Sequence, residues 1–529
     1  MPHRPNGPIA MFLICLLFLL ATARPASAEV TRIEFTSKQP YGTFRVGDYV
    51  IWQGSIHGDL SPQEAIPGID KAARNERGRV AYSARIVLIM PEANRGGNGA
   101  LLLDVPNRGR AYAEALYNSP RDAPFVSGTL EQGTGFLQDH GFSVAEVYWE
   151  LGHDADLPLF VDADGKKRYV EGAGFAIVRD AADFLAHAPA DTAGTPNPLN
   201  GAINRTLASG KSQDGRFLKT FLLNGFNMVG NRRVFDGMHV FVSAAGLLPI
   251  LQTGTGPESS GNDLPTFTNP EFPGVNDGPL TIGEIVAKVE ARGEVPPKML
   301  LINSTTDYYS LRASLGRTGA SGTADQPLPA NVRMYDIAGG SHVIVPKAPT
   351  CTLPPGRLDW ASLSRALLLR LDAWVGLNAE PPASVLMPLE AAGGEPPALR
   401  APAKLSSAMI QVPRRDADGN AVGGVRLPDI AVPTATNGGQ NQPQTFTCML
   451  VGSFSAFAAT KAQRERAGAA RPSIEERYRS RDDYVNRVRV AAQDLLARGF
   501  LLPEDAAVII QAAASSNLFG PAPANPAPR

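Results

Sequence analysis

The chain has 529 residues and a formal net charge of −1, and 43% of its residues are hydrophobic and 19% charged. These are ordinary values for a globular protein, and a net charge so close to zero gives no electrostatic reason to expect nucleic-acid binding. A prior of about 150 residues per domain would suggest three domains. The order of the elements favours instead one large domain over residues 36–512, with insertions.

Residues 1–28 have the pattern of a secretory signal peptide. The apolar run IAMFLICLLFLLATA follows a weakly basic start, and a small-residue cleavage motif ends at Ala28. We therefore expect export to the periplasm or the medium, with cleavage after Ala28. An uncleaved anchor is the alternative, but the run is short for a span of about 20 residues. No later stretch is long and apolar enough to predict a membrane span.

Short apolar runs alternate with helical patterns along the rest of the chain. Continuous apolar strands separated by helices predict a mostly parallel central sheet with helices on both faces. The runs that we expect to form strands lie at 84–91, 100–105, 142–149, 205–209, 238–244, 298–303 and 332–338.

Amphipathic patterns predict helices at 281–293, 359–376 and 481–499, and Thr281 and Glu284 have the spacing of a capping box. Three further segments interrupt or follow this pattern. Their Gly- and Pro-rich composition predicts a long inserted loop at 253–279, a side element over the sheet at 378–450 and a disordered tail at 516–529.

The segment ASGKSQDGRF, residues 208–217, resembles the strand–turn–helix elbow that carries the nucleophile of serine hydrolases. Ser212 follows Gly210 by two positions, but the next glycine, Gly215, comes one position later than Gly-x-Ser-x-Gly requires. In such an elbow the glycines give clearance, and the backbone N–H of Gln213 would help to stabilise an oxyanion. We predict that Ser212 is the nucleophile of a Gly-x-Ser-x-x-Gly motif, and a serine in a polar turn is the alternative.

Three charged residues flank this serine. Asp214 is expected in the first turn of the following helix, where a carboxylate suits the helix dipole. Because a negative charge beside an oxyanion would oppose catalysis, we also expect Asp214 to face away from the pocket. For Lys211 and Arg216 we favour ion pairs on the elbow helix over contact with an acidic group of a substrate.

A serine nucleophile needs a base and an orienting acid, which follow it in the order acid, then histidine, in this type of fold. His342 lies in a Gly-rich loop after the predicted strand 332–338, so it is the predicted base. Asp307 follows the strand 298–303 and is the predicted acid, with a helix-capping role as the alternative. Its rivals lie in turns, in the long loop or within a strand: Asp236, Asp263, Asp277 and Asp336.

The remaining candidates are an oxyanion donor, a cysteine pair and metal ligands. The loop after the strand 100–105 offers the backbone N–H of Arg108 as the second oxyanion donor. Cys351 and Cys448 either form a disulfide, which export permits, or stay as two buried thiols. We find no zinc-type spacing and no phosphate loop, and DADGN at 416–420 lacks the later residues of a calcium loop, so we expect no metal and no cofactor.

Several of these segments resemble one known family. The blocks SGKSQDGRF, VPNRGR, NSTTDYY and RYRSRDDYVNRVRVAAQDLLARGF are similar to the alpha/beta hydrolase-domain family of large, mostly secreted bacterial proteins. The resemblance covers about 36–512 and implies an α/β-hydrolase fold with loop insertions and a C-terminal extension. It supports the roles of Ser212, Asp307 and His342. The chain has Asp307 where the family usually has Glu, so His342 would have to lie closer to the shorter carboxylate.

We therefore expect a serine hydrolase that cleaves small carboxylic esters through an acyl-enzyme. One alternative is an esterase of the glucuronoyl-esterase or tannase kind, acting on plant-derived material. The other is a hydrolase-fold binding protein that has lost its activity. The sequence leaves the acyl and alcohol specificity and the oligomeric state open.

Overall fold

The computed structural model describes residues 29–94, 96–120, 133–248, 280–319, 322–392, 410–443 and 445–519. The predicted signal peptide at 1–28 and the predicted loop at 253–279 lie outside these residues, as do the rival acids Asp263 and Asp277. None of the described helices has the length and apolar character needed to span a membrane.

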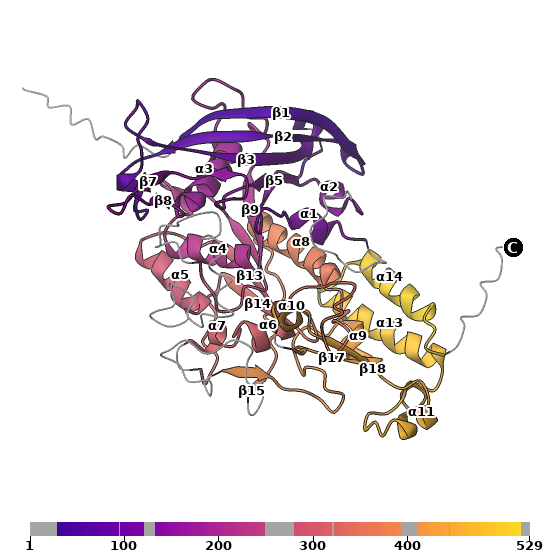
Figure 1. The fold of residues 1–529 in the computed structure, drawn as a ribbon. Helices are drawn as coiled ribbons and strands as arrows, with labels where there is room; N and C mark the ends of the chain where they lie inside the picture. The colour runs from indigo at the N-terminus through magenta and orange to yellow at the C-terminus, as the bar shows by residue number, and fades with distance from the viewer. Residues whose placement is uncertain are drawn as a thin grey trace, which may run out of the picture.

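A mixed sheet of ten strands runs through the centre of the described chain (Figure 1). The strands lie in the order β1-β2-β3-β5-β4-β9-β12-β13-β14, with β6 paired to β3. The six strands from β5 to β14 pair in parallel, whereas β1, β2 and β3 add to them in antiparallel fashion. Their bounds are β1 (Glu29–Phe44), β2 (Gly47–Leu60), β3 (Val80–Pro91), β4 (Ala100–Asp104), β5 (Ser143–Val147), β6 (Ala155–Asp156), β9 (Arg205–Lys211), β12 (Gly237–Phe241), β13 (Lys298–Ser304) and β14 (Val332–Ile337).

The parallel core agrees with the apolar runs of the sequence. All five residues of β4, of β5 and of β12 are buried, as expected for strands covered on both faces. The predicted mostly parallel centre is therefore confirmed, and each predicted strand corresponds to one strand of the sheet. The long β1–β2 hairpin was not predicted, because its residues are largely half-buried and give no continuous apolar run.

Helices cover both faces of the sheet. One face packs against α3 (Ala173–His187), α4 (Gln213–Leu223) and α5 (Ile282–Ala291). The other packs against α1 (Ala113–Tyr117), α2 (Phe136–Asp139) and α8 (Ala361–Leu377), next to the paired helices α13 (Arg481–Ala497) and α14 (Pro503–Ala514). The three predicted helices are thus confirmed as α5, α8 and α13, and Thr281 and Glu284 form the predicted capping box.

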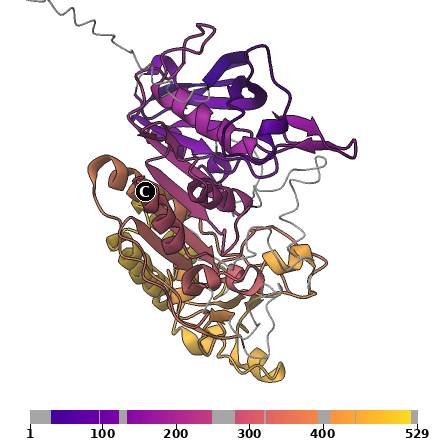
Figure 2. The same cartoon turned by 90° about the vertical axis from the view of Figure 1, so that its left-hand side faces the viewer.

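The C-terminal part of the chain packs at the β14 side of the sheet, at the opposite end of the molecule from β1 and β2 (Figure 2). Within the predicted side element, Val385 and Val425 form single bridges to β14. Phe519, in the predicted tail, packs against Tyr478 and Tyr484. The elements of this part are β15 (Leu389–Ala391), β16 (Gln411–Pro413), α9 (Pro428–Ala431), β17 (Ala435–Gly438), α10 (Phe446–Leu450), β18 (Ser453–Ala456), α11 (Lys461–Arg466) and α12 (Ile474–Arg477).

The remaining elements are short. They are the 3-10 turns η1 (Ile69–Lys71) and η2 (Glu92–Asn94), the hairpins β7 (Leu159–Val161) with β8 (Lys167–Tyr169) and β10 (Met228–Val229) with β11 (Arg232–Arg233), and the helices α6 (Thr305–Ser310) and α7 (Leu315–Thr318).

Candidate active site

Ser212 occupies a strained turn between β9 and α4. Its backbone has φ 60° and ψ −109°, a conformation that is rare for any residue with a side chain. The two neighbouring glycines make this turn possible. A Cβ on Gly210 would lie 2.6 Å from the carbonyl oxygen of Asp214, and one on Gly215 would lie 2.8 Å from the Cβ of Ser243. The later glycine is therefore needed where α4 passes the end of β12, which agrees with the Gly-x-Ser-x-x-Gly interpretation.

The structure brings Ser212, His342 and Asp307 into one hydrogen-bonded series. His342 Nε2 lies 2.9 Å from Ser212 Oγ, and His342 Nδ1 lies 2.6 Å from Asp307 Oδ1. His342 and Asp307 are buried, whereas Ser212 is half-buried. Burial lowers the pKa of His342, against the opposing effect of Asp307, so the imidazole is neutral and able to accept a proton at neutral pH.

Asp307 makes the contacts that both predicted roles would need. Its Oδ2 accepts a hydrogen bond of 2.6 Å from the backbone N–H of Ser304, and its own N–H donates to Ser304 Oγ, which closes a capping box at the start of α6. The other carboxylate oxygen remains for His342. The cap fixes the carboxylate, and the short Asp side chain is matched by the close approach of the imidazole.

The loop that carries His342 rests on two separate segments of the chain. On one side, Thr305 Oγ1 accepts a hydrogen bond from the N–H of Gly339. On the other, Ser341 Oγ donates to the carbonyl of Val451 at 2.9 Å, and the N–H of Val343 donates to the carbonyl of Leu450. The position of the histidine therefore depends on residues about 110 positions later in the chain.

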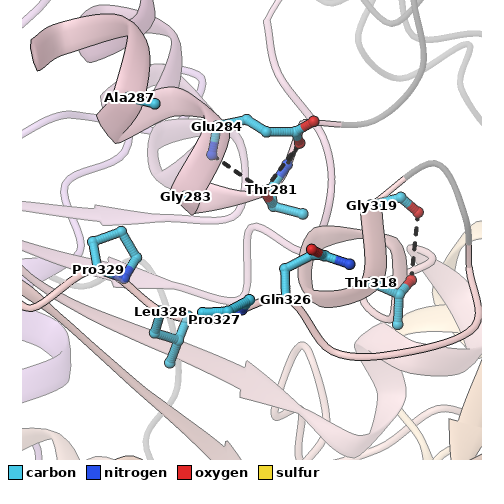
Figure 3. Close-up of a pocket in the computed structure, with 10 residues that line it drawn as sticks. All are labelled: Thr281, Gly283, Glu284, Ala287, Thr318, Gly319, Gln326, Pro327, Leu328 and Pro329. Atoms are coloured by element: carbon cyan, nitrogen blue, oxygen red, sulfur yellow. Dashed lines mark hydrogen bonds between the residues drawn. The ribbon is translucent and has the colours of Figure 1, made fainter.

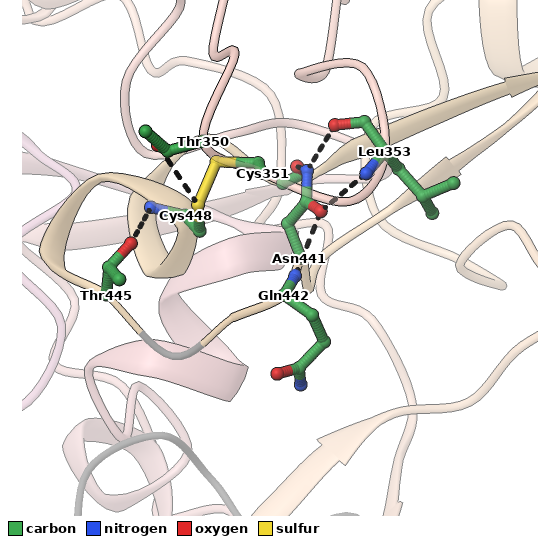
Figure 4. Close-up of a disulfide and its surroundings, with 8 residues drawn as sticks. Thr350, Cys351, Leu353, Asn441, Gln442, Thr445 and Cys448 are labelled. Carbon is green, nitrogen blue, oxygen red and sulfur yellow. Dashed lines mark hydrogen bonds between the residues drawn. A yellow bond between two sulfur atoms is a disulfide. The ribbon is translucent and has the colours of Figure 1, made fainter.

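A disulfide joins Cys351, which follows the His342 loop, to Cys448 in α10, just before Val451 (Figure 4). Beside it, Asn441 accepts a hydrogen bond from the N–H of Leu353 and donates one to its carbonyl. The sequence left open whether the two cysteines form a disulfide or stay as buried thiols, and in the structure they form the disulfide. The disulfide thus links the chain on the C-terminal side of the His342 loop to the segment that supports this loop.

Removing this disulfide with the pair Cys351→Ala and Cys448→Ala is expected to lower the free energy of unfolding by about 2–4 kcal/mol, because the bond closes a loop of 97 residues in the unfolded chain. Denaturant unfolding followed by tryptophan fluorescence measures the loss. Reduced wild-type protein is the control and should unfold at the denaturant concentration of the double variant. Equal midpoints for the variant and the oxidised wild type would contradict the expectation.

The loop after β4 is tied directly to β9. Asn107 Nδ2 donates a hydrogen bond of 2.8 Å to the carbonyl of Lys211, and Trp149 Nε1 donates one of 3.0 Å to the carbonyl of Pro106. Arg108 follows with a positive φ of 49° in a tight turn closed by Asn107 and Arg110. The loop that holds the predicted second oxyanion donor is therefore rigidly anchored next to the elbow.

Gln213, the residue after the serine, begins α4 and is fixed by Glu150. Its side-chain Nε2 donates a hydrogen bond of 2.7 Å to Glu150 Oε1, and both residues are buried. The first N–H groups of a helix lack intrahelical partners, so the backbone N–H of Gln213 suits an oxyanion. The sequence did not predict a role for Asn107 or for Glu150. The segment VPNRGR, which contains Asn107, was the only sequence signal for either residue.

A family model described as alpha/beta hydrolase domain matches residues 61–511. The chain belongs to the alpha/beta hydrolase domain family. The predicted fold class is confirmed by this match together with the observed sheet and helices. A search of curated proteins gave no match.

Solved structures give distant matches. The rice cell wall degrading esterase LipA from Xanthomonas oryzae has 14% sequence identity and a TM-score of 0.28, and the match covers 58% of this chain and 90% of that one. S-formylglutathione hydrolase from Staphylococcus aureus has 10% identity and a TM-score of 0.24, covering 58% of this chain and 91% of that one.

Buried acids surround the base of the elbow. Burial raises the pKa of Asp104 to about 6 and that of Glu146 to about 8, and raises the pKa of Asp214 well above its ordinary value. Both carboxyl oxygens of Asp214 are enclosed and have no hydrogen-bond partner in the described structure. Burial without a partner therefore favours the protonated form of Asp214. Asp214 lies in the first turn of α4 as expected, but its burial disfavours the charged form that would interact with the helix dipole or with an oxyanion.

Asp214→Asn is expected to raise the melting temperature at pH 8 by about 1–3 °C. The folded-state pKa of Asp214 lies above its unfolded value, so its contribution to stability is complete below the unfolded pKa and is lost as the pH rises through the folded pKa. The gain should therefore shrink towards pH 4. Differential scanning fluorimetry from pH 4 to 8 measures it, with the exposed Asp164→Asn as control. A gain that is equal at both pH values would rule out the charge of Asp214 as its cause.

The other rival acids of the described chain have structural partners. Asp236 pairs with Arg233 at 2.7 Å and accepts the N–H of Thr206. Asp336 is buried within β14 and pairs with Arg317 at 2.9 Å. Neither contacts the histidine, so Asp307 is the acid that the fold presents to it.

A pocket of about 580 Å³ opens at the N-terminus of α5, away from these residues (Figure 3). Glu284 accepts hydrogen bonds there from the N–H and the hydroxyl of Thr281. The Glu284 carboxylate, which caps α5, therefore already lies where a bound anion would lie. Among the described residues, no group of three or more His, Cys, Asp or Glu side chains is arranged to hold a metal ion.

Proposed function

We propose that this alpha/beta hydrolase is a serine esterase that cleaves carboxylic esters through an acyl-enzyme. The observation that carries the proposal is the hydrogen-bonded series from Asp307 through His342 to Ser212, at 2.6 and 2.9 Å, with the serine on a strained turn before α4. A serine hydroxyl is a weak nucleophile unless a base accepts its proton, and this series supplies the base.

In the proposed mechanism, Ser212 Oγ attacks the ester carbonyl while His342 Nε2 takes the hydroxyl proton. The carbonyl oxygen becomes an oxyanion, which accepts hydrogen bonds from the backbone N–H groups of Gln213 and Arg108. Asp307 accepts the Nδ1 proton, which keeps Nε2 free as a base and stabilises the imidazolium. The imidazolium then protonates the leaving alcohol.

Deacylation repeats these steps with water. His342 takes a proton from the water, the resulting hydroxide attacks the acyl carbon, and Ser212 leaves with that proton. The proposed steps use only the groups of this chain, the ester and water. Asn107 and Glu150 would act as positioning residues, since they anchor the two segments that present the oxyanion donors.

We also propose that the protein acts after export, in the periplasm or the medium. The signal-like residues 1–28 support this, and so does the disulfide between Cys351 and Cys448, because disulfides persist in oxidising compartments.

A fluorophosphonate probe and an ester library together test the proposed function. We expect the probe to label Ser212, as located by peptide mass spectrometry, and we expect the same preparation to hydrolyse at least one carboxylic ester. If folded protein shows neither labelling nor hydrolysis, the proposal fails and a non-catalytic binding protein is favoured. Labelling at a different serine would also contradict it.

A further inference from the structure

Lys211, the last residue of β9, is a buried cation next to Ser212. Its side chain is almost fully buried, with 3% of the residue exposed. In the described structure no carboxylate lies within ion-pair distance of Nζ, and no oxygen accepts a hydrogen bond from it. The ion pair that the sequence favoured for Lys211 is therefore absent from the described structure.

Lys211 contacts an aromatic ring instead of a carboxylate. Nζ lies 4.9 Å from the centre of the Tyr112 ring, which offsets part of the cost of burying a positive charge. Lys211 keeps only this small exposed fraction, and Nζ is not among the fully enclosed side-chain atoms without a partner. An ammonium group has three N–H donors, and no described residue supplies them with an oxygen acceptor.

The nearby acids do not neutralise Lys211 directly. Asp307 attracts it electrostatically, but the two oxygens of Asp307 bind His342 and the N–H of Ser304. Burial raises the pKa of Asp214 well above its ordinary value, which favours its neutral form. Burial is the largest effect on the pKa of His342, and the charges of Lys211 and Arg216 also lower it, so both cations lie close enough to act on the imidazole.

We propose that Lys211 binds a carboxylate on the substrate, so that the preferred substrates are esters with a free carboxylate a few atoms from the scissile carbonyl. This inference rests on the proposed function. The cation directly precedes the nucleophile in the chain and lies near enough to act on His342, so an anion bound to it would sit beside the reacting ester. A bound carboxylate would supply the acceptor that the chain lacks, as a charge-assisted hydrogen bond.

Two pairs of esters separate the possible positions of the carboxylate. Monomethyl glutarate and methyl valerate differ by a carboxylate in place of a methyl group on the acyl side. O-acetyl glycolate and ethyl acetate make the corresponding comparison on the alcohol side. A pH-stat at pH 7.5 gives kcat/KM for each ester.

We expect the wild type to prefer the anionic ester of at least one pair, and the pair that shows the preference identifies the side of the ester that carries the anion. In Lys211→Met, which keeps most of the length of the side chain without its charge, the ratio of kcat/KM for anionic over neutral ester should fall about 10- to 100-fold. The exposed Lys347→Met is the control for net charge and should keep the wild-type ratio.

The outcomes distinguish this proposal from the esterase proposal. If neutral esters are hydrolysed but the wild type shows no anionic preference in either pair, Lys211 does not bind substrate and the inference is overturned. An equal loss on both members of a pair in Lys211→Met also overturns it and indicates a positioning role. If Lys211→Met does not fold, competitive inhibition of the wild type by glutarate, compared with neutral valeramide, decides the question. Absence of hydrolysis of any ester, together with absence of probe labelling, would contradict the esterase proposal itself.

Discussion

Replacing Ser212 with alanine is expected to lower kcat for ester hydrolysis by roughly 10³- to 10⁶-fold, the range found when a triad nucleophile is removed. The reason is that Ser212 Oγ is the atom that the imidazole of His342 contacts, at 2.9 Å. The residual rate would come from the oxyanion donors and from binding alone. Steady-state kinetics on methyl valerate and labelling by a fluorophosphonate probe measure the effect.

Ser209→Ala is the matched control for this substitution. Ser209 lies on β9, the strand that leads to Ser212, is buried, and contacts Tyr117 at 3.3 Å rather than His342. Its variant should keep both activity and labelling. If Ser212→Ala retained more than about a tenth of the wild-type rate while remaining folded, the assigned nucleophile would be wrong.

Asp307→Asn is expected to lower kcat by about 10⁴-fold, because an amide favours the wrong imidazole tautomer and cannot stabilise the imidazolium. The loss should appear in kcat, with little change in the circular dichroism spectrum. An asparagine side-chain oxygen can still accept the N–H of Ser304, so the cap of α6 is largely kept.

Two further variants sharpen this test. Asp307→Glu keeps the charge but lengthens a side chain that is fixed between Ser304 and His342, so its activity should lie between those of the wild type and Asp307→Asn. Asp325→Asn removes an acid that pairs with Arg317 at the surface and should leave kcat nearly unchanged. Full activity of Asp307→Asn would exclude Asp307 as the orienting acid.

Local sequence patterns predicted most of the sheet and the long helices, because buried parallel strands and amphipathic helices have distinct periodicities. They missed the β1–β2 hairpin. Its strands are half-buried and mix polar with apolar residues, so the hairpin is defined by long-range pairing with β3.

The candidate site shows the same difference between features set by local sequence and features set by long-range contacts. Ser212, Asp307 and His342 were identified because each lies at the end of a predicted strand, in the order that the fold type requires. Asn107 and Glu150 were missed because their contacts join segments more than 60 residues apart. Nothing in the local sequence reports such a hydrogen bond.

The sequence by itself determined the parallel α/β framework, the elbow with its late glycine and the three chemical groups of the series. These features depend on local backbone geometry and on chain order. Only the tertiary structure decided the charge states around them. The pKa of Asp214 rises because the fold buries it, and Lys211 stays without an ion pair because the fold commits Asp307 to His342 and to the cap of α6. Burial and pairing depend on neighbours brought from distant parts of the chain. The states of Lys211 and Asp214, three positions apart and on either side of Ser212, could therefore not be interpreted from the sequence alone.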